Sequence, residues 1–308
     1  MKIIRLLPII GIAIFTYLII TIGIDKILSA FLSIPLILYF FASLLFIPKL
    51  LIETNKWRYI SELQKMNFNF WFLAKVFLIS SFYSVITPGY IGYQIRIYFL
   101  KEKSQASWGK CIANSIMDTS TVFLAGYFIA IIGSPLLIWI LPGLFPILVL
   151  VFGFYLALFA VFMNKKAGSR LFRLFIRFFI PGSYKERLGD SVDSLYEDLP
   201  QLQDMTIPII LEIMVWLLGS YQVIILAKAF AVDIPFITFI IITIIAAIAA
   251  SLPVSVGGLG IREGALVFLL STYGVEPEAA FVISLSSYLV KTIFPAILGG
   301  ITSLKKII

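Results

Sequence analysis

The sequence contains no histidine, a single cysteine and few charged residues. Of its 308 residues, 13% are charged and 61% hydrophobic, whereas a soluble domain has about 25% charged and about 45–50% apolar residues. The absence of histidine excludes imidazole bases, histidine ligands to metals and histidine-dependent membrane acyltransferases. Cys111 alone cannot form an internal disulfide. The composition therefore excludes a soluble protein, and the chemistry that remains uses arginine, lysine and carboxylates, with no metal and no cofactor expected.

What the sequence does contain is long apolar stretches. Residues 6–24, 27–48, 119–164 and 234–261 carry no charged side chain. As helices, with a rise of about 1.5 Å per residue, these stretches are each long enough to cross a hydrocarbon core of about 30 Å. We therefore expect an integral membrane protein with several spans.

The lysines and arginines gather in short stretches between the apolar runs. Such stretches mark the cytoplasmic side of a multi-span protein, so the net charge of +8 reflects topology and not nucleic-acid binding. This rule predicts a protein of the cell membrane with both termini in the cytoplasm. The basic stretches are residues 1–5, 49–65, 101–110, 165–187 and 305–306.

Two regions cannot be simple spans if all basic stretches lie on one side. Residues 76–100 lie between two basic stretches and are interrupted at Pro88-Gly89, which leaves two arms of about half a bilayer each. Residues 236–273 are likewise interrupted, at Pro253 and the glycines that follow it. Between two stretches on the same side, the chain must cross the membrane an even number of times. We therefore predict two re-entrant helical hairpins, the first inserted from the cytoplasmic face and the second from the outer face.

The resulting fold class is an all-α polytopic membrane protein with an inverted repeat. Residues 27–132 form the first predicted repeat and residues 206–303 the second, in opposite orientation within a single membrane domain, 1–308. Residues 163–205 form a cytoplasmic connector whose first half is amphipathic and basic and whose second half is charged. The six full spans are predicted at residues 6–24, 27–48, 109–132, 136–162, 206–230 and 279–301.

Several ionisable residues fall inside the predicted spans and hairpins, where each charge costs at least about 2.5–3.5 kcal/mol. Four of them are basic and three acidic, so full pairing leaves one positive charge unmatched and the site favours an anion such as a phosphate. They are Arg96, Lys228, Arg262 and Lys291, and Asp118, Glu212 and Glu263. Arg96 and Arg262, one from each hairpin, are expected to form one shared anion site near the midplane, beside helix N-termini. The glycines of the turns complete this predicted site: Gly89, Gly92, Gly257, Gly258 and Gly260. Charge balance or proton relay is assigned to Asp118, Glu263, Glu212 and Lys291.

A purely structural alternative remains open for these charges. Arg262 can pair with Glu263 or with Asp118, and Lys291 can pair with Glu212. Such ion pairs would hold helices together without binding a ligand.

The segment Leu252-Pro-Val-Ser-Val-Gly-Gly-Leu-Gly-Ile-Arg-Glu-Gly264 resembles the transmembrane region of lysylphosphatidylglycerol synthases and their stand-alone flippase-like relatives. The resemblance extends to Pro88-Gly-Tyr-Ile-Gly-Tyr-Gln-Ile-Arg96, to Asp118 and to Trp57-Arg58, and covers nearly the whole chain. It implies lipid translocation or the handling of lipid-linked substrates. Tyr93 stands in place of the family glutamate, Thr119 in place of an arginine, and no aminoacyltransferase domain is present, which argues against lysyl-lipid as the cargo.

Three functions remain candidates at this point. The first is a carrier of a phosphate-bearing lipid, either a phospholipid or a polyprenyl phosphate with its sugar. The second is a membrane-embedded glycosyltransferase or headgroup transferase, for which no catalytic residue can be named. The third is a membrane partner of a separate cytosolic transferase. The chain has no P-loop, so ATP is not expected to drive it.

Overall fold

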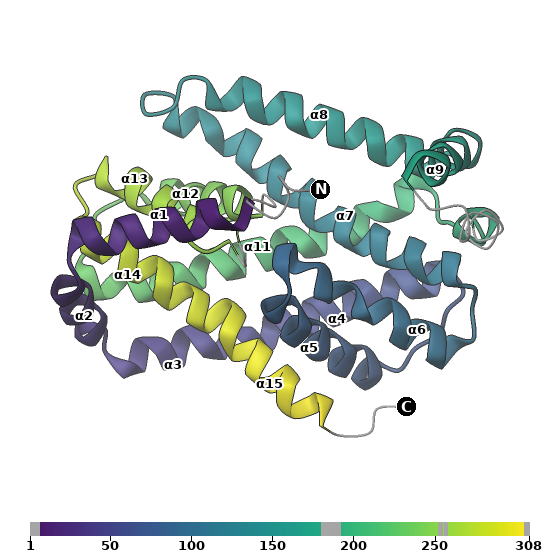
Figure 1. Ribbon diagram of the computed structural model, residues 1–308, viewed down its shortest axis with the longest axis horizontal. Coiled ribbons are helices and arrows are strands. Elements are labelled where there is room, and N and C mark those ends of the chain that lie inside the picture. The colour runs from purple at the N-terminus through teal and green to yellow at the C-terminus, as the bar shows by residue number, and fades with distance from the viewer. Residues whose placement is uncertain (1–6, 180–191, 252–254, 256–257, 305–308) are drawn as a thin grey trace.

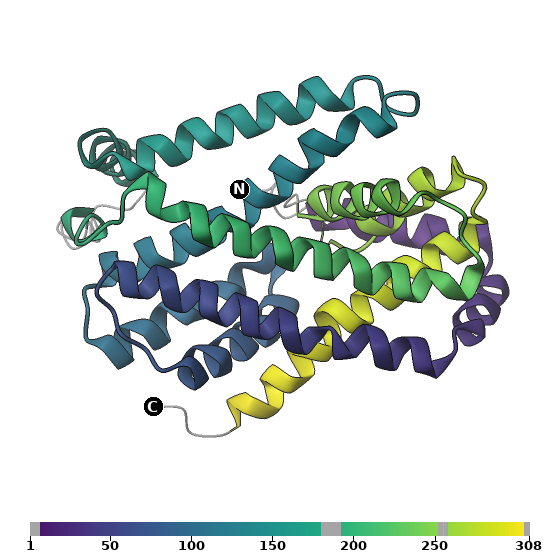
Figure 2. The same ribbon diagram turned by 180° about the vertical axis from the view of Figure 1, so that it is seen from behind.

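The computed structural model describes residues 7–179, 192–251, 255 and 258–304. Throughout these residues the chain forms helices and turns, with no β-strand. Most of the longer helices run along the long axis of the molecule (Figures 1 and 2). The predicted all-α class is therefore confirmed for the described part of the chain.

Among the described residues, five helical stretches are long and apolar enough to cross a membrane, and a bent pair at the N-terminal end makes a sixth candidate. The bent pair consists of α1 (Leu7–Ile22) and α2 (Ile24–Ser33), which meet at 86° beside Gly23. The count agrees with the predicted polytopic protein. The five stretches are Leu36–Leu63, Trp108–Leu137, Leu144–Met163, Leu202–Phe230 and Pro277–Ser303.

The second span differs from its predicted boundaries of 27–48. It comprises α3 (Leu36–Leu44) and α4 (Phe46–Leu63), so the basic stretch that was predicted to be a loop is helical. No proline or glycine interrupts the chain between Pro48 and Leu63, and Pro48 lies in the first turn of α4, where proline is tolerated. The span therefore begins and ends later than predicted, and it brings charged residues into the bundle.

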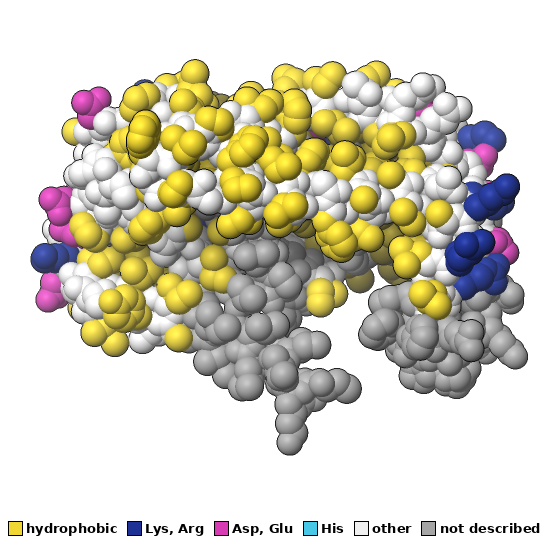
Figure 3. Space-filling view, turned by 90° about the horizontal axis from the view of Figure 1, so that it is seen from above, with side chains coloured by type: hydrophobic (Ala, Val, Ile, Leu, Met, Phe, Trp, Pro, Cys, Tyr) yellow, Lys and Arg dark blue, Asp and Glu magenta, His cyan; other side chains and the backbone are white. Residues whose placement is uncertain are grey.

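Charged and apolar side chains separate along the long axis. In the space-filling view, hydrophobic side chains cover the middle of the molecule, and Lys, Arg, Asp and Glu lie at its two ends (Figure 3). Leu36, Trp139, Leu150 and Phe154 are among the large hydrophobic side chains exposed on the surface. An apolar belt between two charged ends is the surface that a bilayer requires.

In two pairs of antiparallel helices, the end of the first helix and the start of the second lie near the middle of the long axis (Figures 1 and 2). The first pair is α5 (Phe70–Ile86) and α6 (Arg96–Ser104), joined by the 3-10 helix η2 (Pro88–Ile95). The second pair is α12 (Phe236–Ala250) and α13 (Ile261–Ser271). The first opens toward the end of the molecule where α9 lies, and the second toward the end where α2 lies (Figure 1).

The helix α11 (Thr206–Ala227) contacts several other helices with one face and exposes Ile210, Met214 and Leu217 on the other. It packs against α3, α4, α12, α7 (Trp108–Gly133) and α14 (Pro277–Tyr288). After α14 the chain makes one π-helical turn, η6 (Leu289–Ile293), and continues as α15 (Phe294–Ser303), which packs closely on α5. By contrast α8 (Leu144–Met163) lies at the edge and exposes most of its apolar surface. Both candidate sites described below adjoin α11.

The connector begins with α9 (Lys165–Phe179) and is tied to the bundle through Asp198. The Asp198 carboxylate accepts a 2.8 Å hydrogen bond from Lys110 Nζ near the start of α7 and pairs with Lys65 after the end of α4. Asp198 has a φ of 50°, a left-handed conformation that aspartate adopts more readily than most residues. One carboxylate therefore joins the connector to two spans.

We expect this clamp to depend on pH. Hydrogen bonds from Lys110 and Lys65 hold the pKa of Asp198 below its ordinary value, and Asp198 raises the pKa of Lys65. The stabilisation that Asp198 gives to this contact is therefore complete above about pH 4 and is lost as the pH falls through its lowered pKa. The stabilisation that Lys65 gives is complete below about pH 10 and is lost as the pH rises through its raised pKa. At neutral pH, Asp198→Asn should speed amide hydrogen exchange in residues 192–200 by roughly two- to fivefold.

The matched control is Asp193→Asn, which removes one exposed pair with Arg173 from the same connector. It should change exchange less than Asp198→Asn. Equal effects of the two variants would mean that Asp198 is not the clamp.

Candidate functional site

Lys56 lies at the centre of a buried group of charges that we call the Lys56 cluster: Glu53, Lys56, Arg96, Asp118 and Glu212. Its ammonium nitrogen is 2.9 Å from Glu53 Oε2 and 3.2 Å from Asp118 Oδ1, and it donates a hydrogen bond to Glu212 Oε2. All five side chains belong to residues that are at most 8% exposed. Side chains of α4, α7 and α11 meet at the Lys56 ammonium, and Arg96 of α6 joins the cluster through Asp118.

Arg96 uses its guanidinium donors within this cluster. Its Nη1 donates a 2.5 Å hydrogen bond to Asp118 Oδ2, and its Nε donates a 2.9 Å hydrogen bond to Ser115 Oγ. Its Nη2 donates to Thr119 Oγ1 at 3.0 Å. The guanidinium carbon also lies 4.3 Å from the ring centre of Tyr93, a cation–π contact. Arg96 is therefore fully engaged with protein groups in this conformation.

A second set of polar side chains fixes α4 against α7 beside the cluster. Trp57 Nε1 donates a 2.7 Å hydrogen bond to Asn114 Oδ1, and Asn114 Nδ2 donates one of 2.9 Å to Gln64 Oε1. The Trp57 ring also lies 5.3 Å from the Arg96 guanidinium carbon. These bonds determine the register in which Lys56 faces Asp118.

The second candidate site is a cavity of about 220 Å³, the Arg262 cavity, between α12, α13 and the junction of α14 with η6. Arg262 Nη2 donates a 2.6 Å hydrogen bond to Glu263 Oε1, and its guanidinium carbon lies 4.4 Å from the ring centre of Tyr288. Glu263 is held further by Ser284 Oγ at 3.2 Å and by the Gly260 amide at 2.6 Å. The residues that line the cavity are Ala247, Ala250, Ser251, Arg262, Ser287, Tyr288, Lys291 and Thr292.

Lys291 faces this cavity without a carboxylate partner among the described residues. The charged groups that act on it are Lys49 and Arg262, both positive. Its ammonium nitrogen lies beside Gly219 of α11, where an added Cβ would be 3.5 Å from it. Lys291 is also in the π-helical turn η6, and such turns occur frequently at functional sites. Because Arg262 is paired with Glu263, the Arg262 cavity carries an excess of one positive charge when Lys291 is protonated.

The glycines of the predicted site have mainly conformational roles in this structure. Gly260 has a φ of 82°, which favours glycine, and this conformation directs its amide to Glu263. Gly92 donates its amide hydrogen to Thr87 Oγ1 at 2.7 Å, inside η2. Gly89 lies in the same 3-10 helix, and Gly258 precedes α13 with a φ of 74°. Gly257 lies outside the described residues.

The structure divides the predicted site residues between the two sites. Arg96, Asp118 and Glu212 belong to the Lys56 cluster, and Arg262, Glu263 and Lys291 to the Arg262 cavity. Of the ion pairs in the purely structural alternative, that of Arg262 with Glu263 is present. The alternative pairing of Glu212 with Lys291 is wrong, because Glu212 is paired with Lys56. The single anion site shared by Arg96 and Arg262 stays a prediction, since each arginine has its own partners here.

Sequence reasoning missed Lys56 and Glu53, which were assigned to a cytoplasmic loop. The signal that could have found them is helical periodicity. Residues 53, 56, 57, 60, 61 and 64 recur at the spacing of one helix face, and all are buried.

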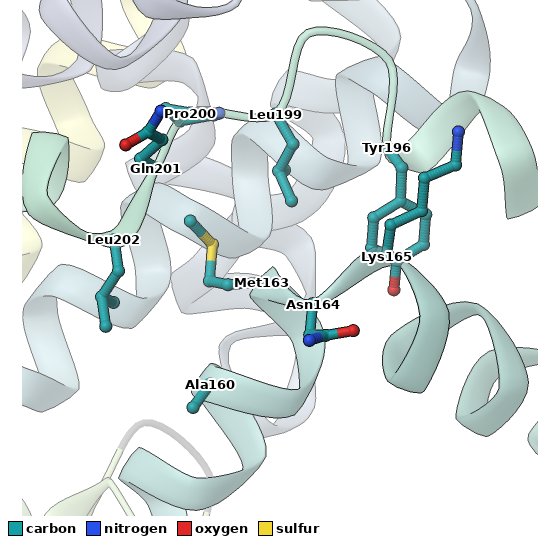
Figure 4. Close-up of a pocket in the computed structure, with 9 residues that line it drawn as sticks. All are labelled: Ala160, Met163, Asn164, Lys165, Tyr196, Leu199, Pro200, Gln201 and Leu202. Carbon is teal, nitrogen blue, oxygen red and sulfur yellow. The ribbon is translucent and has the colours of Figure 1, made fainter.

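A larger cavity, of about 450 Å³, lies where α8 meets α9 and the connector (Figure 4). Lys165 is the charged residue of its lining, and Asn164, Tyr196 and Gln201 supply further polar groups. The described lining thus contains fewer charges than the Arg262 cavity.

Comparison with known proteins supports the interpretation of this chain as an integral membrane protein. A family described as "Lysylphosphatidylglycerol synthase TM region" matches residues 8–299. Two relatives named "UPF0104 membrane protein", both from Methanothermobacter thermautotrophicus, are similar to this chain. One is 28% identical over 61% of this chain and 61% of its own length, and the other is 27% identical over 83% of this chain and 79% of its own length. The chain thus spans less than two thirds of the first relative. Because the family match covers nearly all of the described spans, this chain belongs to the lysylphosphatidylglycerol synthase transmembrane-region family.

Proposed function

We propose that this protein is a flippase-like carrier that binds a phosphate-bearing lipid and moves its headgroup across the bilayer. The cargo class includes phospholipids and polyprenyl phosphates that carry a glycan. The observation that carries this proposal is the positive excess of the Arg262 cavity. A cavity inside an apolar bundle that contains two cations and no free carboxylate among its described lining residues favours an anionic group.

The two cations suit a phosphate in different ways. A guanidinium presents a planar fork that can donate two parallel hydrogen bonds, whereas an ammonium is a compact charge that adjusts to several positions. Ser287, Thr292 and Tyr288 add hydroxyl groups to the same lining. Ala247 and Ala250 of α12 supply an apolar wall suited to the glycerol or polyprenyl portion next to the headgroup.

The helical pairs support a transport path. We propose that α5 with α6, and α12 with α13, are re-entrant hairpins inserted from opposite faces, within an inverted repeat of residues 27–132 and 206–303. The turn between α5 and α6 lies near the middle of the molecule, as do the end of α12 and the start of α13 (Figures 1 and 2). The N-terminal end of α13 lies beside Arg262, and a helix N-terminus favours negative charge. A headgroup at the Arg262 cavity would thus be stabilised where the bilayer is least polar.

Orientation follows from the charged ends. We propose that the end with Lys65, Lys110 and α9 faces the cytoplasm of a cell membrane, because basic residues mark that side of a multi-span protein. The second hairpin then opens outward and the first inward. A binding site that opens in turn to each face of the membrane would then allow the headgroup to cross.

Transport by purified protein in phosphatidylcholine vesicles tests the function. Fluorescent phosphatidylglycerol and a fluorescent polyprenyl phosphate are placed in both leaflets, and the fraction protected from a membrane-impermeant quencher is followed with time. Protein-containing vesicles should lose this protection without any cosubstrate, whereas empty vesicles should keep it. Glu62→Gln, which alters an exposed ion pair with Arg58, should transport like the unmodified chain.

The other outcomes separate the remaining candidates. A new lipid species in the mass spectrum after addition of a sugar or headgroup donor would favour a transferase and overturn the carrier. Protection that stays unchanged for both lipids would overturn the carrier as well, and would leave the partner of a cytosolic transferase as the remaining candidate.

A further inference from the structure

The Lys56 cluster has an imbalance of charge. It contains two cations, Lys56 and Arg96, and three carboxylates, Glu53, Asp118 and Glu212. Counted by helical rise, Lys56 lies about 10 Å from the end of α4, and Asp118 about 15 Å from the start of α7. If all five groups were ionised, a net negative charge would therefore be held inside the bundle, where an uncompensated charge is costly.

A buried oxygen atom in the cluster also lacks a donor. Asp118 Oδ1 accepts no hydrogen bond from the described residues, although Lys56 Nζ lies 3.2 Å away. A metal ion does not fit the cluster, because no group of acidic side chains in the described residues is arranged to hold one, and the Lys56 ammonium occupies the centre. The charge that balances the third carboxylate is therefore best supplied by a proton.

Contacts with the cations identify the carboxylate that holds this proton. Asp118 contacts both Lys56 and Arg96, which favour its ionised form. Glu53 is the most exposed of the three, with 11% of its side chain accessible. Glu212 is 2% exposed, contacts Lys56 alone, and is acted on by the two other carboxylates. Glu53 and Glu212 each contact Lys56 alone among the described cations, and Glu212 is the more deeply buried of the two, so it is the carboxylate for which ionisation costs most.

The same face of α11 connects Glu212 to the Arg262 cavity. Glu212 and Gly219 are seven residues apart, which places them on one face about 10 Å apart along the helix. Gly219 is the residue beside which the Lys291 ammonium lies. No charged residue lies between Glu212 and Gly219 on α11. The proton site is therefore about two helical turns along α11 from Gly219, beside which the unpaired cation of the cavity lies.

We propose that Glu212 carries one exchangeable proton, which enters past Glu53, and that this proton moves together with the anionic lipid. The coupling to lipid rests on the proposed carrier function, whereas the proton site does not. Protonation forms one O–H bond on the Glu212 carboxylate and leaves Lys56 paired with Glu53 and Asp118. An anion at Lys291 and Arg262 then binds roughly tenfold more tightly when Glu212 is neutral, and by linkage it raises the proton affinity of Glu212 by the same factor.

Infrared spectroscopy of the protein in phosphatidylcholine nanodiscs tests the proton site directly. At neutral pH the spectrum should contain the carbonyl band of a neutral carboxylic acid. Glu212→Gln should remove this band, and the surface variant Glu62→Gln should retain it. Because glutamine has the shape of the protonated acid, the Glu212 variant should fold. The band should also disappear from the unmodified chain at alkaline pH, a result that needs no variant.

Transport in vesicles with an imposed proton gradient tests the coupling. The gradient should accelerate movement of fluorescent phosphatidylglycerol, a protonophore should abolish the acceleration, and Glu212→Gln should transport at one rate with or without the gradient. Absence of the neutral-acid band from the unmodified chain would overturn the proton site. A band without any gradient dependence of transport would overturn the coupling. A band without any transport would contradict the carrier function and leave the proton site standing.

Discussion

Lys56→Met is expected to destabilise the protein by about 3–5 kcal/mol, the usual cost of removing one member of a buried ion pair. The variant leaves the two ionised carboxylates, Glu53 and Asp118, with one cation, Arg96, to balance them. Methionine fills a similar volume, so the loss should come from charge and not from a void. The measurement is the midpoint of unfolding of the detergent-solubilised protein, followed by tryptophan fluorescence during a denaturant titration.

Arg58→Met is the matched control, two residues along the same helix. Arg58 is exposed and forms its ion pair with Glu62, so its loss should cost at most about 1 kcal/mol. Adding Glu53→Gln to Lys56→Met should restore part of the lost stability, because it removes an ionised carboxylate that had been paired with Lys56. Equal effects of Lys56→Met and Arg58→Met would show that the cluster does not stabilise the bundle.

The position of Lys56 shows where the sequence pattern is ambiguous. A stretch that contains Lys49, Lys56, Arg58 and Lys65 is typical of a cytoplasmic loop, and charge alone cannot distinguish a solvated lysine from one that pairs across helices. In the structure the same stretch has two faces. Arg58 is exposed and pairs with Glu62, whereas Lys56 and Trp57 are buried against α7 and α11. The partners of Lys56 lie 62 and 156 residues further along the chain, at Asp118 and Glu212, so only the packed bundle identifies them.

The bend between α1 and α2 was unpredictable for a related reason. Gly23 permits a positive φ of 94°, but a glycine within an apolar run can equally lie inside a straight span. The packing of α2 against α14 selects the bent form. By contrast the interruptions near Pro88 and Gly260 were predictable, because proline lacks an amide hydrogen and a short glycine-rich segment favours a turn.

The pairing of Arg96 was predictable in kind but not in detail. A buried arginine requires an acceptor, and Asp118 was one of three carboxylates available within the predicted spans. Its further bonds to Ser115 and Thr119 depend on the rotation of α7 about its axis. The sequence offered Glu212 as a partner for Lys291, but Glu212 is paired with Lys56 in the structure. The charged groups that act on Lys291 are both positive, Lys49 and Arg262.

Lys291→Met is expected to weaken binding of a phosphate-bearing lipid by roughly 10–150-fold, the loss of one charge-assisted hydrogen bond of about 1.5–3 kcal/mol. The same variant should leave the stability of the lipid-free protein unchanged or raise it. Among the described residues Lys291 has no carboxylate partner, so its removal eliminates an unbalanced charge near Arg262 and Lys49. A side chain that lowers the stability of the lipid-free protein but favours lipid binding is typical of a binding site. A structural ion pair would instead stabilise the lipid-free protein.

Native mass spectrometry in a neutral maltoside detergent measures the binding, with phosphatidic acid as the probe and diacylglycerol as the comparator that lacks the phosphate. The unmodified chain should retain phosphatidic acid in preference to diacylglycerol, and Lys291→Met should lose this preference. Lys228→Met, which removes an exposed lysine at the end of α11, should keep it. Lysine and arginine differ in how they hold phosphate, so Lys291→Arg should retain binding while changing which headgroups are preferred. If Lys291→Met unfolds more readily yet binds phosphatidic acid as before, Lys291 is structural and the anion must bind elsewhere.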